Sequence, residues 1–217
     1  MTVKIVSAIV FMLAVSSPAM AAPKPTPAPM HLDCAGPVAP KLSAKALLAR
    51  FGKDAKVGDI PGAEGQTTKG IILYPNDPAR RLTVTYWDDA QTAVSNVSLG
   101  EKATGWTAPG GLKLGATLAE VAAANGNPFE ISGFDWDYGG YVTNLRGGKL
   151  AKLPGGCSLQ IRFDPPVGAH LGAALEGERT IASTAPLLQK LGPKVSELSI
   201  GWPLPEGVKA SDGGTAD

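Results

Sequence analysis

Three short segments of this sequence share one pattern, in which a hydroxyl residue precedes an apolar stretch that ends at glycine. The segments are AKALLARF after Ser43, LAEVAAAN after Thr117 and TAPLLQKL after Ser183, and they end at Gly52, Gly126 and Gly192. Hydroxyl side chains cap the N-termini of helices, and glycine accepts the left-handed turn that closes their C-termini. The apolar residues recur at the i, i+3, i+4, i+7 spacing of a helix with one buried side. The sequence therefore predicts three short helices that each pack on a flat surface, with Leu187 and Leu188 facing inward in the third.

Between these segments the apolar period changes from about four residues to two. Leu159, Ile161 and Phe163 alternate with Gln160 and Arg162. In the same way Leu198, Ile200 and Trp202 alternate with Glu197 and Ser199. This alternation is typical of antiparallel strands with one buried and one solvent-facing side. The predicted strands are residues 70–74, 82–87, 94–99, 129–134, 141–145, 158–163 and 195–202. The fold class that follows is α+β, with short helices packed on an antiparallel sheet.

The order of the predicted elements suggests an internal repeat. A helix followed by three strands occurs twice, and a helix followed by one strand ends the series. This order is compatible with two tandem α-β-β-β modules, at residues 37–105 and 106–205, the second ending in the α-β unit. Because capping follows general rules, similar helices also arise without any duplication, and both interpretations stay open.

The N-terminus has the three regions of an export signal. Residues 1–4 carry a lysine, residues 5–15 are almost wholly apolar, and Ala19 and Ala21 supply small residues for cleavage. The apolar run is shorter than the roughly 20 residues that a membrane-spanning helix needs. We therefore expect a signal peptide over 1–21, a proline-rich spacer over 22–30, a folded domain over 31–205 and a flexible tail over 206–217. The mature chain is expected to be a soluble periplasmic protein without a transmembrane segment.

The charge balance excludes nucleic acid as a partner. The chain has 20 Lys and Arg against 19 Asp and Glu, with a formal net charge of +1. Binding to nucleic acid requires clustered basic residues that replace counterions, and the sequence has no such cluster. An envelope protein or a cell-wall ligand fits the expected compartment better.

The sequence has two cysteines, Cys34 and Cys157. In an oxidising compartment such a pair usually forms a disulfide. The alternative is two separate thiols, and the spacing fits no metal site. We predict that the disulfide ties the start of the domain to a late strand.

The richest candidate for chemistry is the stretch from Phe134 to Tyr141, FDWDYGGY. On a strand, Asp135 and Asp137 would point to one side, where two carboxylates could act as an acid–base pair with Tyr138 beside them. The alternative is a strand end with solvated aspartates. No catalytic, metal or cofactor motif appears elsewhere in the sequence.

The same stretch can be interpreted as a binding surface. Trp136, Tyr138 and Tyr141, with Arg146 nearby, have the composition of recognition patches. The alternative is that these scarce aromatic residues belong to the core. We therefore expect a non-catalytic binding module without a cofactor or metal, and keep an envelope hydrolase that uses Asp135 and Asp137 as the alternative.

Two resemblances add to this interpretation. The block GNPFEISGFDWDYGG at residues 126–140, with GGKL at 147–150, resembles a family of uncharacterised exported bacterial proteins. The stretch from Leu112 to Pro128 is similar to the helix opening of the fold shared by the β-lactamase inhibitor protein and small outer-membrane-assembly lipoproteins. The first resemblance implies a bacterial envelope location, and the second implies a module that binds other proteins.

Overall fold

The structure, a computed structural model, describes residues 30–62 and 65–211 of the 217-residue chain. The predicted signal peptide and residues 22–29 of the predicted spacer lie outside the described residues. The α-helices are α1 (Ala44–Phe51), α2 (Leu118–Asn125) and α3 (Pro186–Leu191), and the 3-10 turns are η1 (Gly52–Asp54) and η3 (Pro109–Gly111). The strands are β1 (Met30–His31), β2 (Ala55–Pro61), β3 (Thr67–Leu73), β4 (Leu82–Tyr86), β5 (Val94–Leu99), β6 (Trp106–Thr107), β7 (Glu130–Ser132), β8 (Val142–Asn144), β9 (Ser158–Asp164), β10 (Thr180–Ala182) and β11 (Lys194–Gly201).

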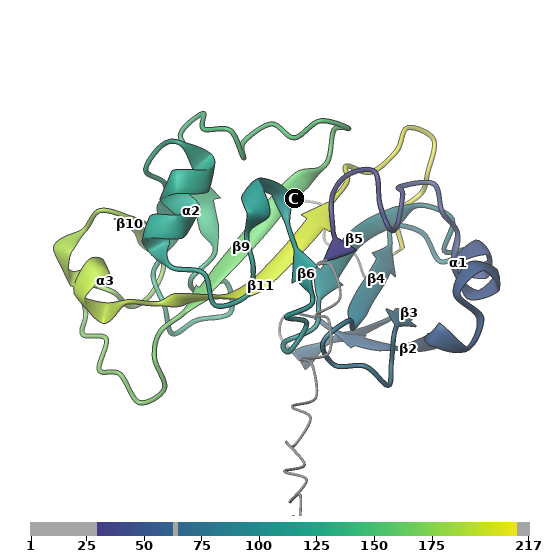
Figure 1. Ribbon diagram of the computed structural model, residues 1–217, viewed down its shortest axis with the longest axis horizontal. Helices are drawn as coiled ribbons and strands as arrows, with labels where there is room; N and C mark the ends of the chain where they lie inside the picture. Colours follow the sequence, from purple (N-terminus) through teal and green to yellow (C-terminus); the bar gives the residue numbers. More distant parts are fainter. Residues whose placement is uncertain (1–29, 63–64, 212–217) are drawn as a thin grey trace, which may run out of the picture.

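The strands form two antiparallel sheets and one short parallel pair. The long sheet has six strands in the order β2-β3-β4-β5-β11-β9, and the small sheet has the order β10-β7-β8. The parallel pair joins β1 to β6. In Figure 1, α1 lies beside β2 and β3 at one end of the long sheet, and α2 and α3 lie at the other end. The predicted α+β class, with short helices on antiparallel sheet, is confirmed.

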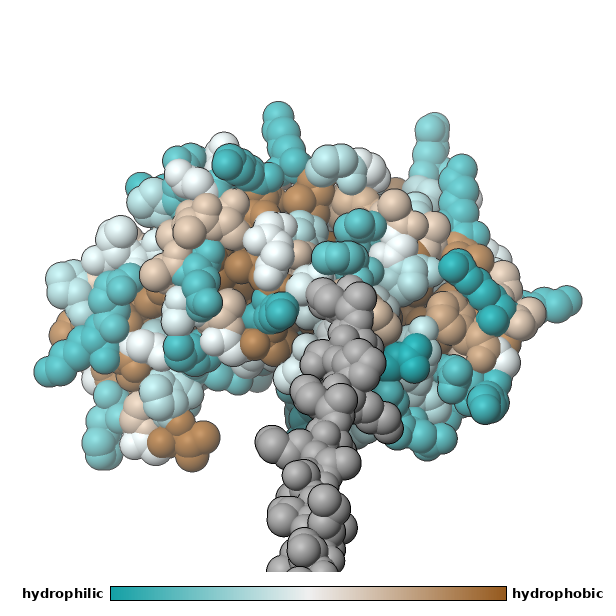
Figure 2. Space-filling model, in the orientation of Figure 1, coloured by the Kyte–Doolittle hydropathy of each residue, from teal (hydrophilic) through white to brown (hydrophobic). Residues whose placement is uncertain are grey.

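One side of the long sheet forms the core because its strands alternate as the sequence predicts. Val84, Val97, Ile200 and Leu159 lie in register across four neighbouring strands, and all are buried. On the side of the molecule that Figure 2 shows, hydrophilic residues are spread among smaller hydrophobic areas.

The first two helices begin and end where their caps predict. The Ser43 hydroxyl accepts from the Ala46 N–H, and Thr117 and Glu120 form a reciprocal capping box. The apolar side of α1 is buried at Ala44 and Leu47. The ends of both helices are determined by local sequence, because the capping residues and the apolar residues of each helix lie within about ten residues of each other.

The third helix begins later than predicted. Ala185, not Ser183, is its N-cap, and Pro186 is its first residue. The residue before a proline is driven out of the helical region, and Ala185 is indeed extended, with φ −60° and ψ 128°. Ser183 instead accepts a hydrogen bond from the Phe129 N–H at 3.0 Å. The inward placement of Leu187 is also wrong, because this side chain is 56% exposed, whereas Leu188 is buried.

The two sequence modules share the long sheet. Its β2–β5 part belongs to residues 37–105, and β11 and β9 belong to residues 106–205. In the second module only these two strands join the long sheet, while β7 and β8 pair with β10. Strand β11, the last in sequence, lies between β5 and β9 and so connects the two parts.

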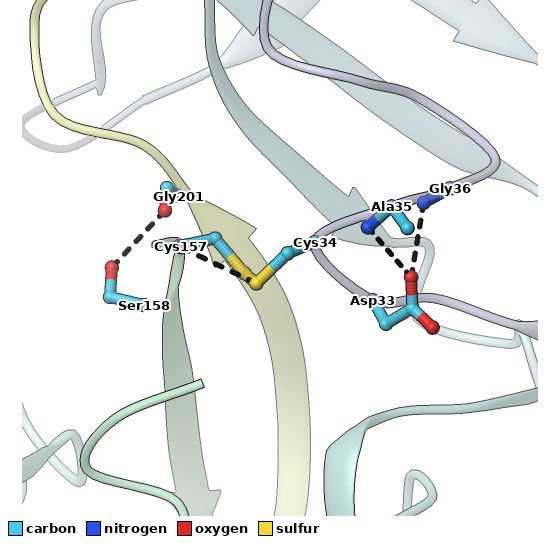
Figure 3. The surroundings of a disulfide bond; sticks show 7 residues. All are labelled: Asp33, Cys34, Ala35, Gly36, Cys157, Ser158 and Gly201. Carbon is cyan, nitrogen blue, oxygen red and sulfur yellow. Dashed lines mark hydrogen bonds between the residues drawn. A yellow bond between two sulfur atoms is a disulfide. The ribbon is translucent and has the colours of Figure 1, made fainter. Parts of the chain in front are cut away.

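The predicted disulfide between Cys34 and Cys157 is confirmed, with a Cα–Cα distance of 5.4 Å and a sequence separation of 123 residues. Figure 3 shows it at the start of β9, with Ser158 reaching the end of β11 at Gly201. Gly155 allows the close approach, because a Cβ atom there would lie 2.7 Å from the Cβ of Cys34. The bond therefore fixes the start of β9 against the N-terminal segment.

The C-terminal segment follows β11 and returns to the β4–β5 connection. The Ser211 N–H donates to the Trp87 carbonyl at 2.7 Å. Residues 206–211 of the predicted flexible tail are described, and residues 212–217 lie outside the described residues.

Candidate functional site

The side of the long sheet opposite the core is polar, and we call it the polar face. Strand register places ten of its residues on β4, β5, β11 and β9: Thr83, Thr85, Asn96, Ser98, Glu197, Ser199, Gly201, Ser158, Gln160 and Arg162. Only Glu197 and Arg162 are charged. The other eight residues carry a hydroxyl, an amide or no side chain. The face is therefore mostly neutral and rich in hydrogen-bonding groups.

A hydrogen-bond network orders the centre of the polar face. The Ser199 hydroxyl donates to Gln160 Oε1 at 2.9 Å, and Asn96 Nδ2 donates to the same oxygen at 3.2 Å. The Ser98 hydroxyl donates to Asn96 Oδ1 at 2.7 Å. Ser199 is fully buried beneath its neighbours, whereas Gln160 is exposed. Buried polar groups held in this way restrict the rotamers of the side chains above them.

A shallow groove of about 480 Å³ lies at one end of the polar face. Its lining combines two aromatic residues with small or neutral polar ones: Trp87, Ser95, Asn96, Gly156, Cys157, Ser158, Gln160, Gly201, Trp202 and Pro203. These residues come from the end of β4, from β5, from the loop that carries the disulfide, from β9 and from the end of β11. The disulfide thus stabilises one wall of the groove.

Trp87 is held in place from both sides. Its Nε1–H donates to the Trp202 carbonyl at 3.0 Å, and its backbone N–H donates to the Ala93 carbonyl at 2.8 Å. The carbonyl of Trp87 accepts from Ser211. The carboxylate of the next residue, Asp88, accepts hydrogen bonds that hold the turn between β4 and β5. Burial raises the pKa of this carboxyl, but the hydrogen bonds from Ala93 and Thr92 have the larger combined effect, so the pKa is lowered. The indole is therefore a fixed, partly exposed wall of the groove.

Gly201 leaves the floor of the groove without a side chain. A Cβ atom at this position would meet its nearest neighbours at 3.5–3.7 Å, which is ordinary contact. Gly70, also in the long sheet, differs, because a Cβ there would lie 2.4 Å from the Val84 carbonyl oxygen. The backbone requires glycine at position 70 but does not require it at 201.

The charged residues of the polar face gather at the end away from the groove. The Tyr141 hydroxyl donates to Glu197 at 2.8 Å, and the Arg162 guanidinium lies 5.4 Å from the centre of the Tyr141 ring. Arg162 also contacts Asp164 at 3.6 Å. Burial, and then the Glu197 charge, raise the pKa of Tyr141 to about 12. Tyr141, one of the residues expected to bind, thus lies at this charged end.

The expected acid–base pair does not lie on a strand. Strand β7 ends at Ser132, and Asp135 adopts a left-handed φ of 68°. The alternation that would align Asp135 with Asp137 therefore stops before the first of them, so this geometric prediction is wrong. Both aspartates are exposed, and neither forms a hydrogen bond or ion pair in the described part of the chain.

Trp136 lies in the loop between β7 and β8, whose backbone also pairs with two other segments. The Phe134 N–H donates to the Leu175 carbonyl at 2.7 Å, and the Phe163 N–H donates to the Gly140 carbonyl at 2.9 Å. Trp136 Nε1 donates to the Gly133 carbonyl at 2.9 Å, and the Trp136 and Tyr138 rings meet edge to face at 5.4 Å. The Ser132 hydroxyl donates to the Tyr138 carbonyl. Tyr138 is 48% exposed. Two of the expected binding residues are therefore neighbours on an exposed turn.

Arg146 lies apart from these aromatic residues. Its guanidinium pairs with Glu130 at 2.6 Å, and its backbone N–H donates to the Asn144 side chain at 2.8 Å. Since the turn joins Ser132 to Val142, Glu130 and Asn144 lie at the opposite end of the β7–β8 hairpin. The structure therefore brings Trp136 and Tyr138 together, but not with Arg146.

Two other hollows have structural explanations. One, of about 570 Å³, lies between residues 110–116 and α2, where Lys113 and Glu120 are the charged lining residues. Glu120 is engaged in the capping box: hydrogen bonds from the Thr117 N–H and hydroxyl lower the pKa of its carboxyl. Another, about 410 Å³, is built around the Asp88 turn and residues 207–210. The groove differs because its polar side chains come from several strands.

Sequence reasoning named Gln160 as a solvent-facing strand residue but did not find the groove. A single glycine in an otherwise alternating strand was the available signal at Gly201, because such glycines often mark a close approach of another group. The other lining residues are far apart in sequence, and no local spacing connects them.

The described residues contain no group of three or more His, Cys, Asp or Glu arranged to hold a metal ion. Within residues 30–62 and 65–211, no helix has the length and apolar character needed to cross a membrane. Comparison of the chain with protein-family models, curated proteins and solved structures gave no match in any of the three. The resemblances drawn from the sequence therefore stay predictions.

Proposed function

We propose that this chain is a non-catalytic binding module of the bacterial envelope, and that it binds its partner on the polar face of the long sheet. The observation that carries the proposal is the Asn96–Ser199–Gln160 network, which orients neutral hydrogen-bonding groups on a surface of the sheet. Preorganised side chains lose little conformational freedom on binding, which favours recognition.

The proposed location is the periplasm. The disulfide supports an oxidising compartment, and the sequence of residues 1–21 has the regions of a cleavable signal. Cell fractionation tests this proposal together with mass determination of the product. A periplasmic protein that begins at Ala22 is expected, whereas a cytoplasmic product that retains residues 1–21 would contradict it.

Binding to envelope fractions tests the function. The purified mature protein is mixed with separated cell-wall, membrane and periplasmic fractions, and retention is measured by sedimentation or cross-linking. Gln160→Arg places a long charged side chain at the centre of the polar face, so we expect it to reduce retention by about tenfold or more. Gln66→Arg is the matched control, since Gln66 is exposed and lies outside the polar face.

Retention that is equal in the wild type and in Gln160→Arg would show that another surface binds. The absence of retention on every fraction would overturn the proposal. Circular dichroism of each variant establishes that a lost interaction does not result from unfolding.

A further inference from the structure

The groove at the end of the polar face has a lining without a charged side chain. It offers the amides of Asn96 and Gln160, the hydroxyl of Ser158 and the indole of Trp87. From this chemistry we infer that the groove binds a neutral glycan segment. The inference rests on the proposed function, because it specifies the ligand of the same polar face.

The amide of Gln160 is oriented for an incoming ligand. Its Oε1 accepts from Ser199 and Asn96, so its Nε2 points away from the network. The structure gives Nε2 no hydrogen-bond partner among the residues that it describes. An amide nitrogen carries two donors, and sugar hydroxyls and ring oxygens are suitable acceptors. A glycan would satisfy donors that are otherwise left to water.

The indole of Trp87 supplies an apolar surface of fixed orientation. Its polar Nε1–H is already used by the Trp202 carbonyl at 3.0 Å, so the exposed part of the ring has only its apolar atoms to offer. Sugar rings present C–H groups on their flat sides, and these pack on aromatic rings. An indole beside amide groups therefore fits a ligand that has an apolar side and a polar rim.

Gly201 gives the ligand room to approach the sheet. The glycine has no positive φ, and a Cβ atom would fit without a clash. Glycine inside a strand is less favourable than alanine, so the fold alone does not account for the glycine at this position. A flat floor beneath a bound ring accounts for it.

Charged ligands fit the groove less well. Glu197 and Arg162 lie at the other end of the polar face, where they contact Tyr141, Asp164 and the Gly139 carbonyl. A phosphate or a carboxylate in the groove would meet no cation among the lining residues. Its desolvation would go uncompensated.

Titration with two neutral oligosaccharides tests the inference: the tetramer of N-acetylglucosamine and the tetramer of glucose. The disulfide-bonded mature protein is titrated by calorimetry and followed by two-dimensional amide NMR. We expect at least one tetramer to bind with a dissociation constant below about 1 mM. Shifted amide signals should include Gln160, Ser158 and Gly201.

Three variants provide the comparison. Gln160→Ala removes the free donors from an exposed position and is expected to weaken binding by about tenfold. Gly201→Leu fills the groove and is expected to abolish binding. Gln66→Ala, an exposed glutamine in the β2–β3 connection, should bind like the wild type. If Gly201→Leu fails to fold, Gln160→Ala still decides the question.

Two results would overturn the glycan inference: no binding of either tetramer at about 10 mM, or binding that Gln160→Ala leaves unchanged. If neither tetramer binds but an envelope protein is retained by the wild type and lost in Gln160→Arg, the glycan inference fails and the proposed function stands. If no fraction is retained either, both fail.

Discussion

The indoles of Trp136 and Trp87, in two different regions of the molecule, are held by contacts of very different sequence range. Trp136 donates its indole N–H to Gly133, three residues away, and packs on Tyr138 within the same turn. Trp87 donates its indole N–H to Trp202, 115 residues away, and faces side chains from other strands. The Trp136 indole is therefore held by contacts within its own turn, although the backbone of that turn also bonds to Leu175 and Phe163. The groove exists only when strands distant in sequence are assembled.

A stretch of sequence rich in aromatic and acidic residues is therefore not necessarily the place where residues distant in sequence form a site. The turn concentrates aromatic and acidic residues within eight positions, and local contacts account for Trp136 and Tyr138. Phe134 is instead buried in the core, and Tyr141 donates to Glu197 on β11. The groove has no conspicuous block, yet it gathers neutral polar side chains from β5 and β9 beside Gly201 of β11. Variants that affect one region and spare the other test whether the two regions have separate roles.

The largest effect is expected at the disulfide, which supports the groove wall. Replacing Cys34 and Cys157 by serine releases a constraint across 123 residues. Loop-closure entropy predicts a loss of up to about 5 kcal/mol in the free energy of unfolding. Urea denaturation of the double variant measures this loss, with the oxidised wild type as reference. Equal midpoints for the two proteins would contradict the prediction.

Two glycine-to-alanine changes form a matched pair. Gly140 has a φ of 78°, and a Cβ atom there would lie 2.0 Å from the Phe163 carbonyl oxygen. We expect Gly140→Ala to destabilise the protein by about 3 kcal/mol, through backbone strain and this clash. Gly201→Ala should be neutral or stabilising by up to about 1 kcal/mol.

Thermal and urea unfolding of both glycine variants give the measurement. A large loss of stability in Gly201→Ala would mean that the fold itself needs this glycine. Gly201 would then be a structural glycine like Gly140, and its presence would not indicate a ligand.

Trp136→Ala is expected to have a moderate effect on stability. It removes the edge-to-face contact with Tyr138 and the hydrogen bond to Gly133, at a cost of about 1–2 kcal/mol. Binding to envelope fractions should remain unchanged, because the groove does not include this turn. Trp87→Phe, which removes the donor to Trp202, should reduce binding. If Trp136→Ala reduced binding and Trp87→Phe did not, the binding site would lie on the β7–β8 turn instead of the groove.

The smallest effect concerns Tyr141 at the charged end of the polar face. Because its folded pKa is raised to about 12, above the ordinary value of 10.0, the neutral form is favoured in the folded protein. The stability that this provides is complete below pH 10 and is lost as the pH rises to 12. Solvent screening of the partly exposed ring keeps the loss below about 1 kcal/mol.

Urea denaturation between pH 9 and 12 measures this loss, with Tyr141→Phe as the comparison. The variant should have a shallower decline, with one fewer titrating proton. Burial, and then Asp88, also raise the pKa of Tyr86, so part of the decline should remain. Identical curves would contradict the role given to Tyr141.

The parts of the fold that sequence predicts are those with local causes. Helices α1 and α2 follow from Ser43, Thr117 and the glycines that close them. The start of α3 was missed because Pro186 overrides the cap expected at Ser183. Strand β2 was missed because AKVGDIP contains glycine and proline, which are tolerated on an edge strand.

The site was less predictable than the fold. Alternation placed Gln160 and Ser199 on a solvent-facing side, but strand order decides that they are neighbours. Neither the position of β11 between β5 and β9 nor the approach of Trp87 to Trp202 can be read from residue spacing. The cysteine pair was the exception, because its chemistry and the expected compartment identify the partners without geometry.

The position of β11 has a consequence for how the molecule is completed. Ribosomes deliver a chain from its N-terminus, so the strand that fills the middle of the long sheet arrives after the other described strands. Until residues 194–201 emerge, β5 and β9 cannot both pair with their neighbour. A chain truncated before Lys194 would keep two unpaired strand edges, which are prone to aggregation. Delivery of β11 is thus the step that completes the long sheet.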